Sequence, residues 1–318
     1  MKLVPVLFPC DLGRTTRGTH YTTGERSADM ILLDLLEGEG VRLARPIVVA
    51  VPEALPPEDP LTPLKQDKPI AAAVRALGEV VGRINAEGHF PVVLGGDQLA
   101  MCGQILGHSV RHAEGIGLAI LADAWLDLAL PAIPVYDELQ RLKSDPEVTK
   151  DGDAHGMVLS AALRHLSVST ELGAAMAASK VVAAQTSVVG VRGPQTAQVK
   201  ARAKVTPIEI WTMERLELDG ESAYRAVLAR HLTQGPIALS IDARGLDPHL
   251  MTAVADPVSD GLEWKFLKRS LEQCLPHIDR VLGLDISQVD VRRDDANHTA
   301  TSRLVEILAP FLQRVSKT

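Results

Sequence analysis

Short apolar runs alternate along the chain with longer segments in which apolar residues recur every three or four positions. The runs are rich in Val, Ile and Leu, and several lack the apolar–polar alternation of a half-exposed strand, which is typical of strands buried on both faces. The runs predict eight strands: Leu3–Leu7, Ile47–Val51, Phe90–Leu94, Leu118–Ala122, Ser187–Val191, Ile208–Trp211, Ile237–Ile241 and Val281–Ile286. The helical spacing predicts helices at Ser27–Leu36, Ile70–Ile84, Ser222–Leu232, Glu263–Leu275 and Thr299–Gln313.

This alternation of strands and helices predicts an α/β fold. We expect a three-layer α-β-α architecture around a mostly parallel sheet of about eight strands. The segment Pro52–Pro63 contains five prolines and predicts a rigid exposed loop, because proline cannot donate a hydrogen bond to a sheet. Since the strand–helix pattern continues on both sides of this loop, we expect a single domain over residues 1–318.

The composition is that of a globular protein with an acidic balance. Among 318 residues, 40 are acidic and 33 are Lys or Arg, which gives a net charge of −7 without a basic cluster. This balance argues against nucleic acid as the main partner. The three cysteines are odd in number and have unrelated spacings, so we expect neither a disulfide framework nor a zinc ribbon, and a cytoplasmic location.

Two stretches invite a membrane or targeting interpretation, and neither supports it. The apolar run Leu3–Phe8 is too short for a signal peptide. The longest weakly charged stretch, Gly115–Tyr136, contains Asp123 and Asp127, which a membrane span would not tolerate cheaply. We therefore expect no membrane association.

Carboxylates follow four of the predicted strands, at the end where an open parallel sheet binds its ligands. These segments are Gly95-Gly96-Asp97-Gln98, Asp123-Ala124-Trp125-Leu126-Asp127, Asp242-Ala243-Arg244-Gly245-Leu246-Asp247 and Asp285-Ile286-Ser287-Gln288. Aspartate also caps helices and opens turns, which is the simpler interpretation of Asp97 and Asp247. Asp123, Asp127 and Asp242 in one crevice would be costly without a neutralising cation or arginine, so we expect a charged site.

Taken in order, these segments resemble the motifs of the arginase/agmatinase family of ureohydrolases. The matching segments are Gly95-Gly96-Asp97, Asp123-x-x-x-Asp127, His155-Gly156-Met157, Ser240-Ile241-Asp242, Leu246-Asp247-Pro248 and Asp256-Pro257-Val258-x-x-Gly261-Leu262, with looser matches at Arg17-Gly18 and Gly190-Val191-Arg192-Gly193. The resemblance covers nearly the whole chain. It implies an eight-stranded parallel sheet, trimers or hexamers, and a two-manganese site that activates water to attack a guanidinium carbon.

Three positions that supply metal ligands in the family carry other residues here. Gln98 stands for the histidine of Gly-Gly-Asp-His, Trp125 for the histidine of Asp-Ala-His-x-Asp, and Arg244 for the second aspartate of Ser-x-Asp-x-Asp. The residues that match the family's remaining ligands are Asp123, Asp127 and Asp242.

The resemblance also assigns three residues to the substrate and to proton transfer. Gln288 stands where the family has the glutamate that pairs with the substrate guanidinium, and Ala129 where arginases have an asparagine that holds the amino-acid end. His155 matches the family's proton-shuttle histidine and is the one candidate catalytic residue.

The charges of these residues decide against a binuclear cluster. Two divalent ions and Arg244 carry five positive charges against three aspartates, and neither an indole N–H nor a protonated guanidinium can ligate a metal. A single Mn or Mg ion held by Asp123, Asp127, Asp242 and Gln98 would balance the charge with oxygen donors only. The interpretation we favour has no cofactor, with Arg244 forking to Asp123 or Asp242.

We therefore predict a pseudoenzyme of the ureohydrolase family with a ligand-binding or regulatory role. We expect it to lack arginase and agmatinase activity and to form a homo-oligomer or to assemble with an active paralogue. The alternative is an active hydrolase of guanidino, amidino or amide C–N bonds that uses one hard divalent cation, with His155 handling protons. A third possibility is an oligomeric scaffold without a ligand.

Weaker signals receive simpler interpretations. His108 and His112 are spaced for one helix face, but Ser109 stands where a zinc peptidase needs glutamate, so we predict an exposed helical face. Cys102 is predicted to be a buried thiol. Trp125 is predicted to fill volume, with the wall of an apolar ligand pocket as the alternative.

Overall fold

The computed structural model describes residues 1–13, 27–55, 64–131, 135–136, 142–143, 152–195 and 197–318. Arg17 and Gly18, the looser N-terminal match, lie outside these residues. So do residues 56–63 of the predicted proline-rich loop, whose described part, residues 52–55, forms no helix or strand.

Eight strands form one sheet in which every neighbouring pair is parallel. In sheet order they are β2 (Ile47–Val48), β1 (Leu3–Phe8), β3 (Phe90–Gly95), β10 (Val281–Ser287), β9 (Ile237–Asp242), β4 (Ile116–Ala122), β7 (Val181–Val191) and β8 (Glu209–Thr212). The predicted α/β fold and its eight strands are confirmed. The strand predicted at Ile47–Val51 is shorter than expected, and a small antiparallel pair, β5 (Val135–Tyr136) and β6 (Leu142–Lys143), was not predicted.

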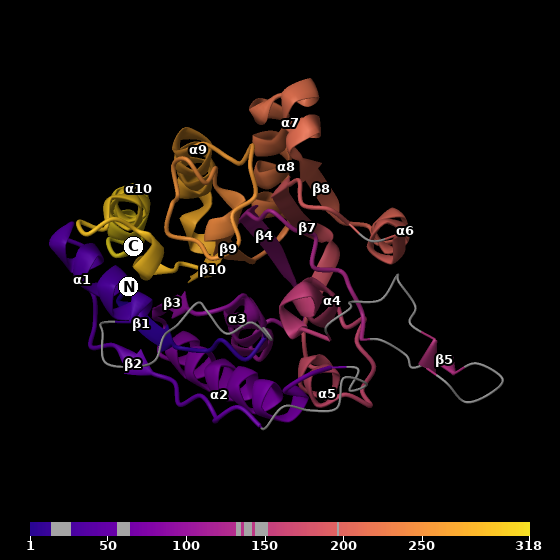
Figure 1. Ribbon diagram of the computed structural model, residues 1–318. Coiled ribbons are helices and arrows are strands. Elements are labelled where there is room, and N and C mark those ends of the chain that lie inside the picture. Colours follow the sequence, from indigo (N-terminus) through magenta and orange to yellow (C-terminus); the bar gives the residue numbers. More distant parts are fainter. Residues whose placement is uncertain (14–26, 56–63, 132–134, 137–141, 144–151, 196) are drawn as a thin grey trace.

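Helices cover both faces of the sheet (Figure 1). One face carries α1 (Ala28–Gly38), α8 (Glu221–Gln234), α9 (Trp264–Cys274) and α10 (Thr299–Val315). The other carries α2 (Asp67–Ala86), α3 (Leu99–Ser109), α4 (Val158–Ala162) and α5 (Glu171–Met176). The remaining helices are α6 (Ala197–Val205), α7 (Met213–Asp219) and the 3-10 helices η1 (Ala154–Met157), η2 (Ala243–Gly245), η3 (Leu275–Arg280) and η4 (Val291–Arg293). The five predicted helices correspond to α1, α2, α8, α9 and α10.

Successive side chains of a strand enter opposite hydrophobic cores, because side chains alternate between the two faces of a sheet. In β1, Leu3 and Leu7 pack under α1 and α10, whereas Val4, Val6 and Phe8 pack under α2 and α3. Burial on both faces explains why these strands read as continuous apolar runs. None of the described helices combines the length and the apolarity needed to cross a membrane.

The prediction of an exposed helix face with two histidines is wrong. Helix α3 ends at Ser109, so His112 lies beyond it, and His108 is fully buried. Asn85 Nδ2 lies 2.8 Å from His108 Nδ1, and burial lowers the pKa of His108 to about 3. His108 is therefore a neutral core residue between α3 and α2.

Candidate functional site

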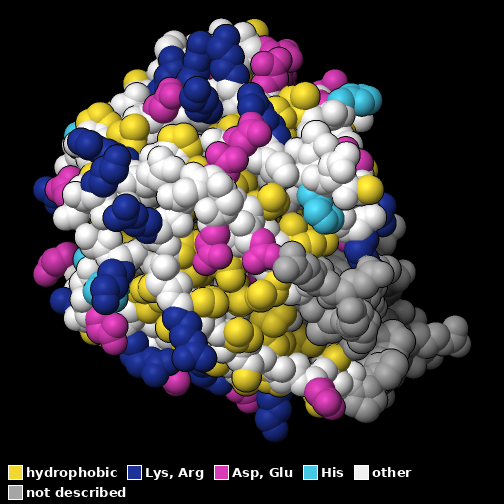
Figure 2. All heavy atoms as spheres, turned by 90° about the vertical axis from the view of Figure 1, so that its left-hand side faces the viewer, with side chains coloured by type: hydrophobic (Ala, Val, Ile, Leu, Met, Phe, Trp, Pro, Cys, Tyr) yellow, Lys and Arg dark blue, Asp and Glu magenta, His cyan; other side chains and the backbone are white. Residues whose placement is uncertain are grey.

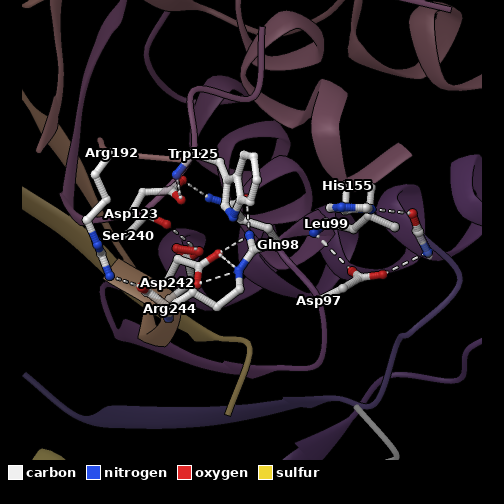
Figure 3. A network of polar contacts seen from close by, with 12 residues as sticks. Asp97, Gln98, Leu99, Asp123, Trp125, His155, Arg192, Ser240, Asp242 and Arg244 are labelled. Atoms are coloured by element: carbon white, nitrogen blue, oxygen red, sulfur yellow. Dashed lines mark hydrogen bonds and ion pairs between the residues drawn. The ribbon is translucent and has the colours of Figure 1, made fainter. Parts of the chain in front are cut away.

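The strands β3, β10, β9 and β4 are consecutive neighbours in the sheet, and all run in the same direction. The segments that follow them therefore meet at one edge, as the sequence predicts. Gln98, Asp123, Trp125, Asp242 and Arg244 come together there, and we call these five residues the strand-end cluster (Figure 3).

Arg244 and Asp242 form the centre of the strand-end cluster. Their side chains are 1% and 0% exposed, so the ion pair is shielded from water. Arg244 Nε donates to both carboxylate oxygens of Asp242 at 3.0 Å, and Nη2 donates to Oδ2 at 2.5 Å. The backbone N–H of Arg244 also donates to Asp242 Oδ1 at 2.8 Å, because Asp242 caps helix η2.

Gln98 and Trp125 donate hydrogen bonds to Asp123, the second carboxylate of the cluster. Gln98 Nε2 donates to Asp123 Oδ2 at 2.5 Å, and its Oε1 accepts from Arg244 Nη2 at 3.4 Å. The backbone N–H of Trp125 donates to Asp123 Oδ1 at 2.9 Å. All four carboxylate oxygens of Asp123 and Asp242 therefore accept hydrogen bonds from protein donors (Figure 3).

The Trp125 side chain is half-buried and packs on Gly193, the residue after Arg192. A Cβ atom on Gly193 would lie 2.7 Å from two ring carbons of Trp125, so only glycine leaves room for the indole. The indole therefore occupies the space directly above Gly193.

The electrostatics of the cluster follow from burial and from the nearness of its two aspartates. Burial raises the pKa of Asp123 to about 7, the charge of Asp242 adds to this rise, and Arg244 opposes it. For Arg244 itself, burial acts to lower the pKa, but Asp242, Asp123 and Asp127 outweigh it and raise the pKa above its ordinary value. The arginine is thus held in its charged form at the centre of the cluster.

Two further residues that the sequence assigns to the site are Asp127, whose charge helps to raise the pKa of Arg244, and His155. The backbone carbonyl of Asp127 accepts N–H groups of Leu159 and Ser160 at 3.1 Å each. His155 Nδ1 lies 3.1 Å from the carbonyl oxygen of Gly13, and Figure 3 shows this side chain on the far side of Gln98 from Arg244. In the part of the chain that the structure describes, no three His, Cys, Asp or Glu side chains form a group that could hold a metal ion.

Ala129 and Gln288, the two predicted substrate-pocket residues, are both buried. The N–H of Ala129 donates to the carbonyl of Gly156 at 3.1 Å, which joins it to the His155 loop. Gln288 follows β10, and its N–H donates to the carbonyl of Gly96 at 2.7 Å. It has a left-handed backbone, with φ of 64°, and both atoms of its buried side-chain amide lack hydrogen-bonding partners among the described residues.

Sequence reasoning missed the role of Arg192. Its guanidinium donates to six backbone carbonyls, which belong to Gly190, Arg244, Gly245, Leu246, Val258 and Ser259. It thereby ties the end of β7 to η2 and to the loop at 258–259, and burial lowers its pKa. The segment Gly190-Val191-Arg192-Gly193 stands out in the sequence. However, the partners of Arg192 are backbone carbonyls, which every residue has, so the sequence could not indicate this role.

The simpler interpretations of three residues are confirmed. Asp97 accepts from the N–H groups of Gly13 at 2.8 Å and Leu99 at 3.0 Å, at the start of α3. Asp247 accepts from the N–H groups of His249 and Gly261 at 2.9 and 3.0 Å. The Cys102 thiol is buried 3.7 Å from the carbonyl of Val158, and burial raises its pKa.

The fold and the order of the motifs agree with comparisons to known proteins. The family model described as "Arginase family" matches residues 48–309. The chain belongs to the arginase family. The arginase of Bacillus caldovelox is 27% identical over 309 residues, which are 95% of each chain. That of Brevibacillus brevis is 28% identical over 234 residues, 73% of this chain and 72% of that protein.

Solved structures of the arginase family share this architecture. The native structure of the Bacillus caldovelox arginase has a TM-score of 0.79 at 23% sequence identity and covers 98% of both chains. The agmatine ureohydrolase of Thermoplasma volcanium has a TM-score of 0.61 at 16% identity, over 99% of this chain and 90% of that one. The resemblance found in the sequence is therefore confirmed for the family and the fold.

Proposed function

We propose that this arginase-family chain is a pseudoenzyme that lacks the binuclear manganese cluster and arginase or agmatinase activity, and that it has a ligand-binding or regulatory role. The observation that carries the proposal is the fork of Arg244 on Asp242 inside the strand-end cluster. A guanidinium in this position uses the carboxylate lone pairs that a metal ion would need.

The donor set of the strand-end cluster does not fit two manganese ions. Gln98 turns its amide nitrogen, which has no lone pair for a metal, toward Asp123. Arg244 supplies a positive charge from within the chain, and two divalent ions beside it would leave excess positive charge in a site shielded from water. We therefore derive no hydrolytic step through manganese.

The buried amide of Gln288 supports a ligand-binding role. Leaving a buried donor or acceptor without a partner costs about 1–3 kcal/mol, and Gln288 has one of each among the described residues. An amide offers a donor and an acceptor side by side, which complements a carboxamide or a urea. It has no charge with which to pair a guanidinium, so we expect a neutral ligand group at this position.

Metal analysis tests the loss of the cluster. Protein purified in the presence of manganese is expected to hold far less than two ions per chain, and the variant Gln98→His/Trp125→His/Arg244→Asp is expected to gain manganese. The single variant Arg244→Asp is the control for simple removal of the arginine. Two tightly held manganese ions in the unaltered protein, together with hydrolysis of arginine or agmatine, would contradict the proposal.

A second candidate function is hydrolysis with a single metal ion, because the possible metal ligands in the cluster are all oxygen atoms. Gln98 Oε1 lies 3.4 Å from Arg244 Nη2, inside the same cluster as both aspartates, and oxygen donors suit a single Mn or Mg ion. Such an enzyme would hydrolyse guanidino, amidino or amide C–N bonds. A substrate panel assayed with and without each metal tests it; turnover that requires metal and is abolished by Asp127→Ala would favour this function over a pseudoenzyme.

The regulatory form of the proposal requires assembly, either into a homo-oligomer or with an active paralogue. Light scattering on the purified chain, alone and mixed with an active family member, distinguishes these forms from a monomer. A monomer under both conditions would remove the regulatory-subunit version and leave the ligand-binding one.

A further inference from the structure

A recess of about 800 Å³ opens where the strands begin, at the opposite edge of the sheet from the strand-end cluster. Three separate segments line it. They are the residues just before β1, the connection from α1 to β2, and the C-terminal end of α10. The recess is therefore independent of the site discussed above.

The side chains around this recess are positively charged. Among the described residues, its lining contains four cations and no carboxylate: Lys2, Arg42, Arg45 and Lys317. In the part of the chain that the structure describes, none of the four forms an ion pair, whereas exposed arginines elsewhere, such as Arg215 and Arg303, do. Four such cations in one hollow of a chain with a net charge of −7 form a local positive field.

Hydrogen bonds hold the walls of the recess together. Leu3 and Leu43 form a parallel bridge, and the N–H of Ala44 donates to the carbonyl of Leu3 at 2.8 Å. On the other side, Gln313 Nε2 donates to the carbonyl of Glu39 at 2.9 Å. The backbone that carries the cations is thus fixed before any ligand arrives, which lowers the entropic cost of binding.

We propose that this recess binds a small molecule that carries two or more phosphate groups. Arg42 and Arg45 can each donate two parallel hydrogen bonds to a phosphate, and the two lysines add point charges. The volume lies within the range of about 300–1,000 Å³ that is usual for small-molecule sites, and it exceeds what one phosphate needs.

The shape and setting favour a small ligand over a polyanionic polymer. A polymer needs a stripe of cations along the surface. On the face that carries α1 and α10, Lys and Arg side chains are scattered among acidic ones rather than aligned (Figure 2). The recess itself is lined by cations and by no carboxylate among the described residues.

Calorimetric titration of the full chain at about 150 mM salt tests the proposal, with tripolyphosphate, ATP without magnesium, and single phosphate as probes. We expect saturable binding of one tripolyphosphate or ATP per chain, and much weaker binding of single phosphate. Tighter binding of ATP than of tripolyphosphate would indicate that the ligand is a nucleotide.

The variant Arg42→Gln/Arg45→Gln should weaken this binding at least about tenfold. The matched control is Lys68→Gln/Arg83→Gln, which removes the same charge from exposed positions on α2, away from the recess. Equal weakening by both variants would mean that net charge alone attracts the anion. Absence of binding to either polyphosphate, or much tighter binding of heparin, would also overturn the proposal.

Discussion

Replacing Arg244 with methionine leaves Asp242 as a buried carboxylate without its counterion. The side chains are 1% and 0% exposed, and the substitution removes three side-chain contacts with Asp242 and one with Gln98. Breaking a buried ion pair by deleting one partner costs about 3–5 kcal/mol, because the remaining charge stays desolvated. We expect Arg244→Met to lower the free energy of unfolding by this amount at pH 8.

Neutralising the partner as well should restore most of the loss. In Asp242→Asn/Arg244→Met the buried charge at position 242 is gone, while the amide oxygen of the introduced asparagine can still accept the backbone N–H that Asp242 accepts. Urea denaturation of the unaltered protein, both single variants and the double variant yields the coupling free energy of the pair. We expect the double variant to be more stable than Arg244→Met by about 2 kcal/mol or more.

The control is an ion pair of the same length on the surface. Arg303 Nη1 lies 2.5 Å from Glu306 Oε2, as close as Arg244 Nη2 lies to Asp242, but its side chains are 56% and 45% exposed. Arg303→Met should change stability by less than about 1 kcal/mol. Two results would contradict this reasoning: a loss of stability in Arg244→Met no larger than in Arg303→Met, or a double variant no more stable than Arg244→Met. Either result would mean that burial of the ion pair does not make its disruption costly.

Three further predictions concern residues outside this pair. The pKa of His108 is about 3 in the folded chain and near 6.5 in the unfolded chain. Between these pH values only the unfolded state binds a proton at His108. The free energy of unfolding should therefore fall as the pH drops from 6.5 toward 3, by at most about 1.4 kcal/mol per pH unit. In urea melts across this range, His108→Gln should flatten that dependence and His112→Gln should flatten it less; parallel curves for both would contradict the burial argument. Arg192→Met should lower the free energy of unfolding by about 2–4 kcal/mol and expose the loop at 258–259 to protease. Arg192→Lys should regain little of the lost stability, because one ammonium group cannot reach the six carbonyls that Arg192 contacts. Gly193→Ala should displace the Trp125 ring and change its fluorescence, an effect that Trp125→Ala should remove; an unchanged spectrum would mean that the ring does not pack on Gly193.

The strands and the outer helices were predictable because their hydrophobic patterns are strong. Strands buried on both faces read as unbroken apolar runs, and α2 and α10 have one apolar side at helical spacing. Most of helix α3 was not predicted, because it is buried nearly all round and shows no such spacing; only its end at His108 fell in the predicted helical face. The strand at Ile47 was overpredicted in length, since only two of its residues pair with β1.

The strand-end cluster was predictable in its members but not in all of its contacts. The sequence left Arg244 a choice between Asp123 and Asp242, and the structure selects Asp242, which lies two residues away and already accepts the arginine's backbone N–H. The position of His155 depends on the carbonyl of Gly13, 142 residues away. Contacts with backbone groups, like those of Arg192, require the assembled fold before they can be recognised.

The pairing of Asp242 with Arg244 also has a consequence for how the chain matures. Both residues belong to one short turn, so the compensating charge is synthesised together with the charge that it compensates. Because this counterion is part of the polypeptide, it cannot dissociate and be lost on dilution as a bound metal ion can. This turn therefore brings its own counterion to the buried carboxylate, whatever ions the surroundings supply.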